Sequence, residues 1–494
     1  MEVSLGLLFA LLLLLSQEDL CKGLRRHDFP SNFVFGAGTS AFQYEGAPAE
    51  DGRTPSIMDH MPGFQPEKSM AIVAADGYHK YKEDVKLMSD TGLEAYKFSI
   101  SWSRLLPSGR GTVNDKGIKY YNNVLDELAR QGIPAYVTLN HLDLPQALQD
   151  EYGGWLSPKI VEDFKAFADV CFEEFGQKVS HWTTMDEPNI NGFSGVLPYY
   201  RCYEFGNSIC KDVNPTNVEY VFIHNMLIAH SEVVKLYKTK YQNQSGWIGL
   251  NVYTFWCQPF SNSSADVEAT QRVNSFMFGW ILNPIVNGDY PELMKKIAGT
   301  RLPSFTKSES EVLKGSFDFI GLNYYTAVYI SDNSSSSKVS VHGFREDVAA
   351  IIRVDKAGLP TEDPFLPIHV PSDFSGLHKM LRCVKEKYGN HPIYIQENGF
   401  ATGPGNALND TARVVYLKGY IGSMLEAIRN GVDVRGYFVW SFVDVFEFLG
   451  GYTYGFGLYH VDFNDLDRRR TPKFSARWYS RFLKGGRILR VVFC

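Results

Sequence analysis

Short apolar segments alternate with amphipathic helical patterns along most of this chain. Each apolar segment spans four to seven residues, which suits a strand that is buried on both faces of a parallel sheet. The eight segments are Phe33–Ala37, Ala95–Ser99, Ala135–Leu139, His181–Met185, Trp247–Tyr253, Phe319–Asn323, Ile393–Gln396 and Arg435–Trp440. We expect each of them to form a strand of one sheet.

The segments between these strands contain amphipathic patterns that predict helices. The clearest patterns are Lys80–Thr91, Lys116–Gln131, Ser157–Phe175 and Asp410–Asn430. Gly92, Gly132 and Gly431 follow three of them, and glycine is the residue that most often ends a helix in the left-handed conformation. Ser157 and Pro158 are expected to begin the remaining helix, as a capping serine followed by a proline in the first turn.

Eight repeats of strand and helix predict an α/β fold, specifically a (β/α)8 TIM barrel in a single domain. Such a barrel needs only about 250 residues, whereas the chain has 494. Long loops after the strands must therefore take up the difference, and residues 187–217 and 324–391 are the candidates. A doubly wound open sheet is the alternative. The absence of a Gly-x-Gly-x-x-Gly sequence after the first strand disfavours the dinucleotide-binding form of that fold.

The composition is that of an ordinary globular protein, with 44% hydrophobic and 21% charged residues. The chain has 49 Lys and Arg against 55 Asp and Glu, which gives a net charge of −6. We expect neither a nucleic-acid nor a membrane partner, because these would require a basic face. Aromatic residues make up 14% of the chain. Besides filling a core, aromatic side chains line sites that stack on the apolar faces of sugars.

Residues 5–15 form an apolar run at the amino terminus that is too short to span a bilayer. Its position predicts a signal peptide over residues 1–23, with cleavage between Ser16 and Gly23. We expect entry into the secretory pathway, since no later stretch is long and apolar enough for a membrane helix. The final location would be extracellular (apoplast) or vacuolar, because no retention signal of the Lys-Asp-Glu-Leu type is present.

Seven cysteines are too few for a disulfide scaffold in a chain of this length. Cys202 and Cys210 enclose only seven residues, and we expect a disulfide between them in an oxidising compartment; two unpaired thiols are the alternative. No Cys-x-x-Cys or His-Glu-x-x-His sequence indicates a zinc site, so we expect neither a metal nor a cofactor. Four Asn-x-Ser/Thr sequences are glycosylation candidates on surface loops: Asn243, Asn262, Asn333 and Asn409.

Two glutamates stand where strands of the barrel would end, which is where barrel enzymes place their chemistry. Glu187 follows the fourth predicted strand and Glu397 follows the seventh. A charge at the end of an apolar strand is costly unless it is paired or functional, so each glutamate alone could be part of a structural ion pair. Together, across the mouth of a barrel, they would supply the acid and the nucleophile or base that cleave a glycosidic bond.

From about Asp28 to Gly485, the chain resembles a plant-type β-glucosidase of glycoside hydrolase family 1. Seven segments carry the resemblance and occur in the family's order, which is specific where a single segment would not be. They are residues 35–46, 98–104, 141–146, 186–188, 321–325, 395–399, and 440–442 with Glu447. The resemblance implies a catalytic domain over residues 24–486, followed by an atypical tail over residues 487–494.

The resemblance implies a retaining enzyme that hydrolyses terminal β-D-glucosyl residues from small glycosides or oligosaccharides. Glu187 matches the general acid/base, Glu397 the nucleophile, and Tyr325 the tyrosine that hydrogen-bonds the nucleophile. The residues matched to sugar binding are Gln43, His141, Asp186, Asn323, Trp440, Glu447, Phe448 and Phe456. The alternatives are a transglucosidase that uses the same covalent intermediate and a catalytically weak barrel that binds glycosides without turnover.

Several residues depart from the family pattern. Asp186 stands where the family usually has Asn, Lys97 where Arg is frequent, and Phe448 where Trp is usual. An ionised Asp186 beside Glu187 would raise the pKa of Glu187, and Lys97 keeps the charge of Arg without its bidentate geometry. We expect lowered activity or a shifted pH optimum relative to an Asp186→Asn variant. Identical pH–rate profiles of the two proteins would contradict this expectation.

Overall fold

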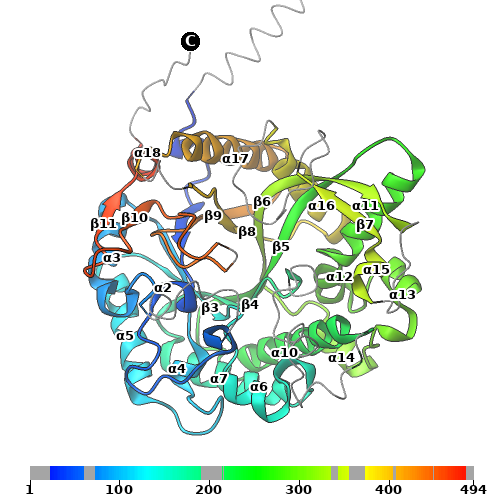
Figure 1. Ribbon diagram of the computed structural model, residues 1–494, viewed down its shortest axis with the longest axis horizontal. Helices are drawn as coiled ribbons and strands as arrows, with labels where there is room; N and C mark the ends of the chain where they lie inside the picture. Colours follow the sequence, from blue (N-terminus) through cyan, green and yellow to red (C-terminus); the bar gives the residue numbers. More distant parts are fainter. Residues whose placement is uncertain are drawn as a thin grey trace, which may run out of the picture.

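The computed structural model describes residues 23–60, 73–190, 214, 216–334, 343–354, 373–403, 408–448 and 450–485. A closed barrel of eight parallel strands forms its centre (Figure 1). These strands are β1 (Val34–Gly38), β2 (Ala95–Ser99), β3 (Ala135–Asn140), β4 (Val179–Asp186), β5 (Trp247–Pro259), β6 (Phe319–Asp332), β8 (Ile393–Asn398) and β9 (Val434–Trp440). Each strand pairs with the next one named here, and β9 pairs with β1 to close the ring. The predicted single-domain (β/α)8 barrel is confirmed.

Helices surround the barrel and cover the outer face of its strands (Figure 1). The longer helices are α3 (Gly77–Thr91), α5 (Asp115–Arg130), α7 (Ile160–Phe175), α10 (Val218–Lys240), α11 (Ser264–Phe276), α12 (Gly279–Asn287), α16 (Ser375–Tyr388), α17 (Thr411–Arg429) and α18 (Phe474–Leu483). The shorter ones are α2 (Ala41–Tyr44), α4 (Trp102–Leu105), α6 (Gln146–Tyr152), α13 (Glu292–Ala298), α14 (Lys307–Leu313) and α15 (Phe344–Val348). Single 3₁₀ turns occupy residues 26–28, 57–60, 154–156 and 299–301.

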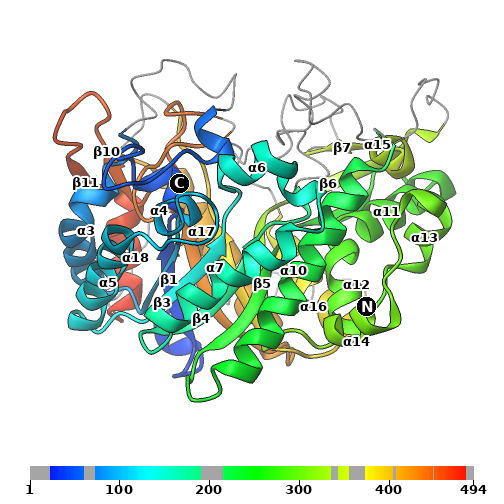
Figure 2. The same ribbon diagram turned by 90° about the horizontal axis from the view of Figure 1, so that it is seen from below.

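Short elements gather at the end of the barrel where the strands terminate. Figure 2 shows α6, α15 and β7 (Ala350–Arg353) at this end, together with β10 (Tyr459–Val461). Strand β7 pairs antiparallel with the outer part of β6, and β10 pairs antiparallel with β11 (Arg470–Pro472). These additions account for part of the length that a minimal barrel does not need.

The predicted strands agree closely with the observed ones, and so do three of the helix ends. Gly92, Gly132 and Gly431 have φ angles of 88°, 69° and 79°. Gly92 directly follows the last residue of α3, and the other two glycines stand two residues after the last residues of α5 and α17. Glycine adopts this left-handed conformation without the steric cost that a Cβ atom imposes. These three glycines therefore end their helices as predicted.

Two predictions of local structure were wrong. The helix expected from Ser157 begins at Ile160, because Ser157 and Pro158 belong to a turn whose carbonyls accept from the amides of Ile160 and Val161. The segment 324–391 is not a single long loop. Strand β6 continues to Asp332 and pairs with the equally extended β5, and α15, β7 and α16 follow. The other expected loop, 187–217, lies mostly outside the described residues.

Aromatic side chains fill the barrel near the amino ends of its strands. His181 stacks on Tyr136 with ring centroids 4.0 Å apart, and its Nε2 lies 3.1 Å from the hydroxyl of Tyr394. Phe319 and Phe438 pack against the same rings. A Cβ atom on Gly36 would lie 2.5 Å from the Phe438 ring, so only glycine fits there. This packing closes one end of the barrel and leaves the carboxyl ends of the strands as the open end.

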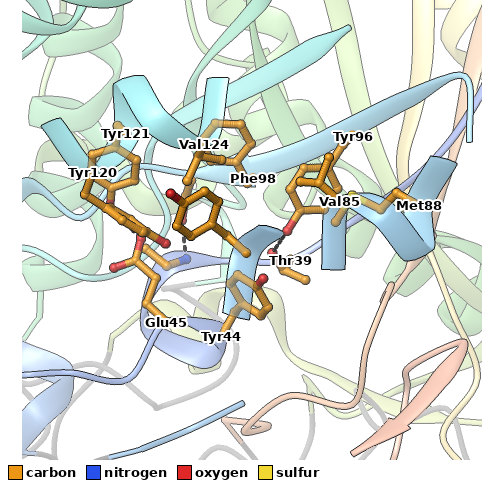
Figure 3. A pocket seen from close by; sticks show the side chains of 13 residues that line it. Thr39, Tyr44, Glu45, Val85, Met88, Tyr96, Phe98, Tyr120, Tyr121 and Val124 are labelled. Atoms are coloured by element: carbon orange, nitrogen blue, oxygen red, sulfur yellow. Dashed lines mark hydrogen bonds between the residues drawn. The ribbon is translucent and has the colours of Figure 1, made fainter. Parts of the chain in front are cut away.

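A separate small cavity lies between the barrel wall and helices α3 and α5 (Figure 3). Its volume is about 20 Å³, and its walls include Thr39, Glu45, Tyr96 and Tyr121. The Tyr121 hydroxyl donates to Glu45 Oε1 at 2.6 Å, and the hydroxyls of Thr39 and Tyr96 pair with each other, so these four residues already have polar partners. The cavity has room for about one water molecule but not for a sugar.

Some sequence predictions concern residues that the structure does not describe. The expected signal peptide, residues 1–23, lies outside the described residues except for Gly23. The expected tail, residues 487–494, and the expected Cys202–Cys210 pair lie outside them entirely. Of the four glycosylation candidates, Asn243, Asn262 and Asn409 are exposed, and Asn333 is half-buried. Within the described part of the chain, no helix has the length and apolar character needed to cross a membrane.

Candidate active site

Polar side chains from five different strands converge at the carboxyl end of the barrel. They are Lys97 on β2, Asp186 on β4, Asn251 on β5, Asn323 and Tyr325 on β6, and Glu397 on β8, and all are buried. Parallel strands of a barrel end at one face, so residues far apart in sequence meet there. Buried polar groups need partners, and the bonds described below connect these residues into one network.

Glu187 lies directly after β4, where the chain turns sharply. Its φ angle is +49°, a left-handed conformation that is unfavourable for a residue with a side chain. Its backbone N–H donates to the carbonyl of Asn251 at 3.0 Å, and its Oε1 accepts from Asn323 Nδ2 at 2.7 Å. Burial, together with the charges of Glu397 and Asp186, raises the pKa of Glu187 well above its ordinary value. Glu187 therefore favours its protonated form.

Glu397, the penultimate residue of β8, is held at both carboxylate oxygens. Oε1 accepts from Lys97 Nζ at 2.7 Å, and Oε2 accepts from the Tyr325 hydroxyl at 2.7 Å. Burial raises the pKa of Glu397, and the Lys97 ammonium opposes that shift without cancelling it. Lys97 thus favours the ionised form of Glu397, while no cation contacts Glu187 in the described structure. The pKa of Glu187 is therefore raised more strongly than that of Glu397, which separates the two acids.

Asp186 makes the largest set of polar contacts in this network. Its Oδ2 accepts from Lys97 Nζ at 2.5 Å, and its Oδ1 accepts from Asn251 at 2.8 Å and from Asn323 at 2.9 Å. His141 Nδ1 lies 3.3 Å from Oδ2. Burial alone would raise the pKa of Asp186, but Lys97 and His141 hold it below its ordinary range. Asp186 therefore favours its ionised form.

His141, Asp186 and Glu397 bring three possible metal-ligand atoms within 4.8 Å of one another. The Lys97 ammonium donates to both carboxylates of this group. A buried ammonium with two carboxylate partners already provides the compensating positive charge that a cation would supply. The donor set is therefore explained as an ion-pair cluster, and the sequence prediction of no metal here stays a prediction.

A second group of predicted residues forms the rim of the same opening. Gln43 on α2 accepts from Ser40 at 2.7 Å through Oε1, and its Nε2 lies 3.4 Å from Glu447 Oε2. The other carboxylate oxygen of Glu447 is buried and has no hydrogen-bond partner among the described residues. Burial raises the pKa of Glu447 to about 8. An unpartnered oxygen beside an amide is suited to a ligand hydroxyl.

Aromatic rings line one side of this opening. Trp440 ends β9 and stacks on His141, with centroids 5.9 Å apart and an interplanar angle of 17°. Phe448 lies 6.3 Å from His141 and stacks on Phe42 at 5.9 Å. Phe456 packs edge-on against Tyr325 at 6.4 Å. Such faces suit the C–H side of a sugar ring.

The structure brings all the sequence-predicted catalytic and sugar-binding residues to one end of the barrel. Gln43 contacts Glu447, and the next residue, Phe448, lies against His141. His141 in turn contacts Trp440 and Asp186, and Asn323 and Lys97 connect Asp186 to the two glutamates. Their geometry is established by these contacts, whereas their roles in catalysis are the subject of the proposal below.

Sequence reasoning overlooked two residues of the network and one buried acid beside it. Asn251 was not considered, although alternation along β5 places residues 247, 249 and 251 on the inner face. Lys97 was noted only as a departure from the family pattern. Asp143 is buried, and neither of its carboxylate oxygens has a partner among the described residues. Burial raises the pKa of Asp143 to about 7.

A family model described as "Glycosyl hydrolase family 1" matches residues 25–486. "Beta-glucosidase 22" of Oryza sativa subsp. japonica is 56% identical over 93% of this chain and 88% of its own length. "Cyanidin 3-O-glucoside 7-O-glucosyltransferase (acyl-glucose)" of Delphinium grandiflorum is 53% identical over 93% of this chain and 91% of its own length.

Solved structures of similar proteins share the fold. The crystal structure of the rice β-glucosidase Os3BGlu6 is 40% identical in sequence and superposes with a TM-score of 0.87, covering 93% of this chain and 99% of that one. A mutant of the same rice enzyme, in a covalent complex with Glc, gives a TM-score of 0.86 at 39% identity and the same coverage. The range matched by the family model, residues 25–486, includes every strand that contributes to the polar network.

Proposed function

The chain belongs to glycosyl hydrolase family 1 and is a glycosidase, and we propose that it is a retaining β-glucosidase. Its substrates would be small glycosides or oligosaccharides with a terminal β-D-glucosyl residue. The observation that carries this proposal is the contrast between two glutamates of one network. Glu397 is bonded by Lys97 and Tyr325, whereas burial and the neighbouring charges hold a proton on Glu187. The relatives named as β-glucosidases support the glucoside class.

In the first half of the reaction, Glu397 attacks the anomeric carbon while Glu187 gives its proton to the departing glycosidic oxygen. The products are an alcohol and a glucosyl ester of Glu397. In the second half, Glu187 takes a proton from water, which attacks the anomeric carbon and releases glucose and the Glu397 carboxylate. The covalent complex of the rice relative with Glc supports an ester intermediate of this kind.

The positions of Asn323 and Tyr325 support this division of roles. They lie two residues apart on β6, so their side chains lie on the same face of that strand. Asn323 donates to Glu187 and Tyr325 donates to Glu397. One strand therefore holds both glutamates, which keeps the acid and the nucleophile on either side of a single sugar position.

The rim would bind the glucosyl unit. We propose that Gln43, His141 and Glu447 exchange hydrogen bonds with its hydroxyls and that Trp440 covers the apolar face of its ring. Glu447 fits this role because one of its oxygens is buried without a partner in the described structure. Phe448 and Phe456 would complete the apolar wall around the sugar.

A transglucosidase is the second candidate. The Delphinium relative is named as a glucosyltransferase that uses an acyl-glucose. Such a transfer uses the same glucosyl ester, with an acceptor oxygen in place of water. A barrel that binds glycosides without turnover is the remaining alternative, and the departures at Asp186 and Phe448 motivate it.

The remaining sequence predictions accompany this proposal. We propose that residues 1–23 are removed as a signal peptide, that the protein acts in the apoplast or vacuole, and that the catalytic domain spans residues 24–486. Glycans on the four predicted asparagines are compatible with the exposure of Asn243, Asn262 and Asn409. Treatment with an endoglycosidase, followed by mass measurement of the secreted chain, tests both the leader and the glycans.

Labelling of the nucleophile tests the proposed function directly. The protein is incubated with a chromogenic β-glucoside and then with a 2-deoxy-2-fluoro-β-glucoside, and the labelled peptide is sequenced. Turnover together with a label on Glu397 supports the retaining β-glucosidase. Binding with neither turnover nor label contradicts it and supports the non-catalytic alternative. Glucosylated products formed when an alcohol or a phenol is added support the transglucosidase.

A further inference from the structure

Lys97 bridges two carboxylates whose fates differ during the proposed reaction. Its Nζ lies 2.5 Å from Asp186 Oδ2 and 2.7 Å from Glu397 Oε1. All three side chains are buried. In the free enzyme the two carboxylates and the ammonium carry one net negative charge. When Glu397 becomes an ester it loses its charge, but Asp186 does not, because it takes no part in bond formation.

Asp186 is also close to Glu187. A single nitrogen, Asn323 Nδ2, donates to Asp186 Oδ1 at 2.9 Å and to Glu187 Oε1 at 2.7 Å. The two acceptor oxygens can therefore be no farther apart than the sum of these distances. At such a separation in a buried site, a carboxylate strongly opposes ionisation of its neighbour.

These contacts determine the electrostatics of Glu187 in the second half of the reaction. After Glu397 is esterified, a lone Lys97 ammonium would favour the ionised form of Glu187, which is the form that activates water. Here the ammonium remains paired with the Asp186 carboxylate, so that its charge is cancelled. The other titratable groups around this site are His141, Tyr325 and Glu447. His141 Nδ1 lies 3.3 Å from Asp186 Oδ2, so a charge on this ring is directed to the Asp186 carboxylate as well.

Resting on the proposed retaining mechanism, we propose that the Asp186–Lys97 ion pair makes Glu187 retain its proton in the glucosyl-enzyme near neutral pH. The glucosyl group then passes more readily to an acceptor that is already anionic, such as a carboxylate or a phenolate, than to water. Asp186 and Lys97 are positioning residues in this scheme, since they act through Glu187 and Glu397. The pair thereby determines the class of acceptor.

The two competing reactions differ only in the fate of one proton. With water, the bond from the anomeric carbon to Glu397 breaks, a new carbon–oxygen bond forms, and one proton of the water passes to the Glu187 carboxylate. With an anionic acceptor the same bond breaks and the acceptor's own electron pair forms the new bond. No proton is transferred, so a protonated Glu187 does not impede this reaction.

Azide provides a small anionic probe for the experiment. Turnover of 2,4-dinitrophenyl β-glucoside is followed from pH 4.5 to 8, with and without azide, for the wild-type protein and Asp186→Asn. Glucose and β-glucosyl azide are quantified at each pH. We expect the acidic limb of azide-free turnover to lie one or more pH units lower in Asp186→Asn, since removing a neighbouring charge shifts a carboxyl by about 1–3 units. The ratio of glucosyl azide to glucose at pH 6 should fall about tenfold.

Asp84→Asn is the matched control. Asp84 and Arg470 form another buried ion pair at 2.8 Å, between α3 and β11. We expect this variant to lose stability while keeping the wild-type product ratio and pH limb. An equal change in the control and in Asp186→Asn would overturn the proposal, because the effect would then be structural. Asp186→Glu, which keeps the charge, is expected to retain the high azide ratio.

The wild-type protein alone also tests the proposal. If its acidic limb lies at or below pH 4.5, close to the ordinary glutamate pKa of about 4.3, Glu187 ionises freely in the glucosyl-enzyme and the proposal fails, even if Asp186→Asn does not fold. That outcome would leave the retaining mechanism intact. Absence of a fluoroglucosyl label on Glu397 would instead contradict the proposed function itself, so the two failures are distinguishable.

Discussion

Asn323 Nδ2 donates a hydrogen bond to Glu187 Oε1 over 2.7 Å. This is the described bond to the side chain of Glu187 that opposes the rise in its pKa caused by burial and by the charges of Glu397 and Asp186. A hydrogen bond to the ionised form of an acid lowers its pKa. Asn323 therefore adjusts how readily the proposed acid gives up its proton, and it also fixes the carboxyl's orientation.

Replacing Asn323 with Ala should raise the pKa of Glu187 further. The alkaline limb of kcat/KM reports ionisation of the acid in the free enzyme, so it should move to higher pH. Loss of orientation should lower kcat/KM by about 10–100-fold, less than the roughly 10²–10⁴-fold that a positioned acid contributes, because the acid itself remains. A pH–rate profile with an aryl β-glucoside measures both effects. An unshifted alkaline limb would show that the bond does not control this proton.

Substitution of the two glutamates should give different kinetic outcomes. Glu397→Gln removes the nucleophile, and we expect kcat to fall by at least about 10³-fold with no burst and no fluoroglucoside label. Glu187→Gln should retain a burst with an activated aryl glucoside, because a good leaving group needs no proton, and then turn over slowly. Stopped-flow measurement of the released phenol distinguishes the two. A burst in Glu397→Gln would refute the assignment of the nucleophile.

Tyr325→Phe should lower kcat by about 10-fold or more, because the hydroxyl that fixes Glu397 Oε2 is lost. The fold should be little affected, since the ring remains. Tyr437→Phe is the control. Its hydroxyl donates to Asn398 Oδ1 at 2.6 Å in the protein interior and touches neither glutamate. We therefore expect Tyr437→Phe to lower the stability of the fold and to leave kcat unchanged. Equal losses of kcat in the two variants would mean that Tyr325 acts through general packing.

Glu447 should make the protein less stable as pH rises. Its pKa is raised to about 8 in the folded protein, whereas an exposed glutamate titrates near 4.3. Between these values the folded state holds a proton that the unfolded state has lost, so the free energy of unfolding falls with increasing pH. Glu447→Gln removes this effect. We expect its Tm to gain about 2–5 °C relative to wild type between pH 5 and pH 8; a constant difference across this range would contradict the argument.

His181 should have the opposite pH dependence. Burial and the charge of Arg435 lower its pKa to about 3, so below about pH 6.5 the unfolded state binds a proton that the folded state does not. Stability from this residue is therefore lost as pH falls. His181→Phe should flatten the acid limb of stability, as measured by urea unfolding from pH 4 to 7. It should leave kcat within about 2-fold of wild type, because His181 lies at the closed end of the barrel.

The strands of this barrel were predictable from sequence because each is apolar on both faces, a requirement that local composition reveals. The same reasoning could not find the outer parts of β5 and β6. Beyond the barrel these two strands pair with each other, with Trp256 opposite Ala327, and β6 also pairs with β7. Their stability depends on a partner about 70 residues distant rather than on their own pattern.

The candidate site was predictable only in part, for a similar reason. Motifs identified Glu187 and Glu397, and a charged residue at the end of an apolar strand is a local feature. Lys97 and Asn251 matter because of what they contact after the barrel closes, and each contact joins different strands. The pairing of Lys97 with both Asp186 and Glu397 is a property of the closed ring and could not be derived from any single segment.

The contact between Gln43 and Glu447 joins residues 404 positions apart, across the closing pair β1 and β9. A nascent chain emerges from its amino terminus, so Gln43 is available long before its partner is synthesised. The proposed sugar-binding rim can then form only after nearly the whole chain has left the ribosome. We therefore expect incomplete chains to be inert towards glycosides, and recovery of activity during refolding to require the closure of β1 onto β9.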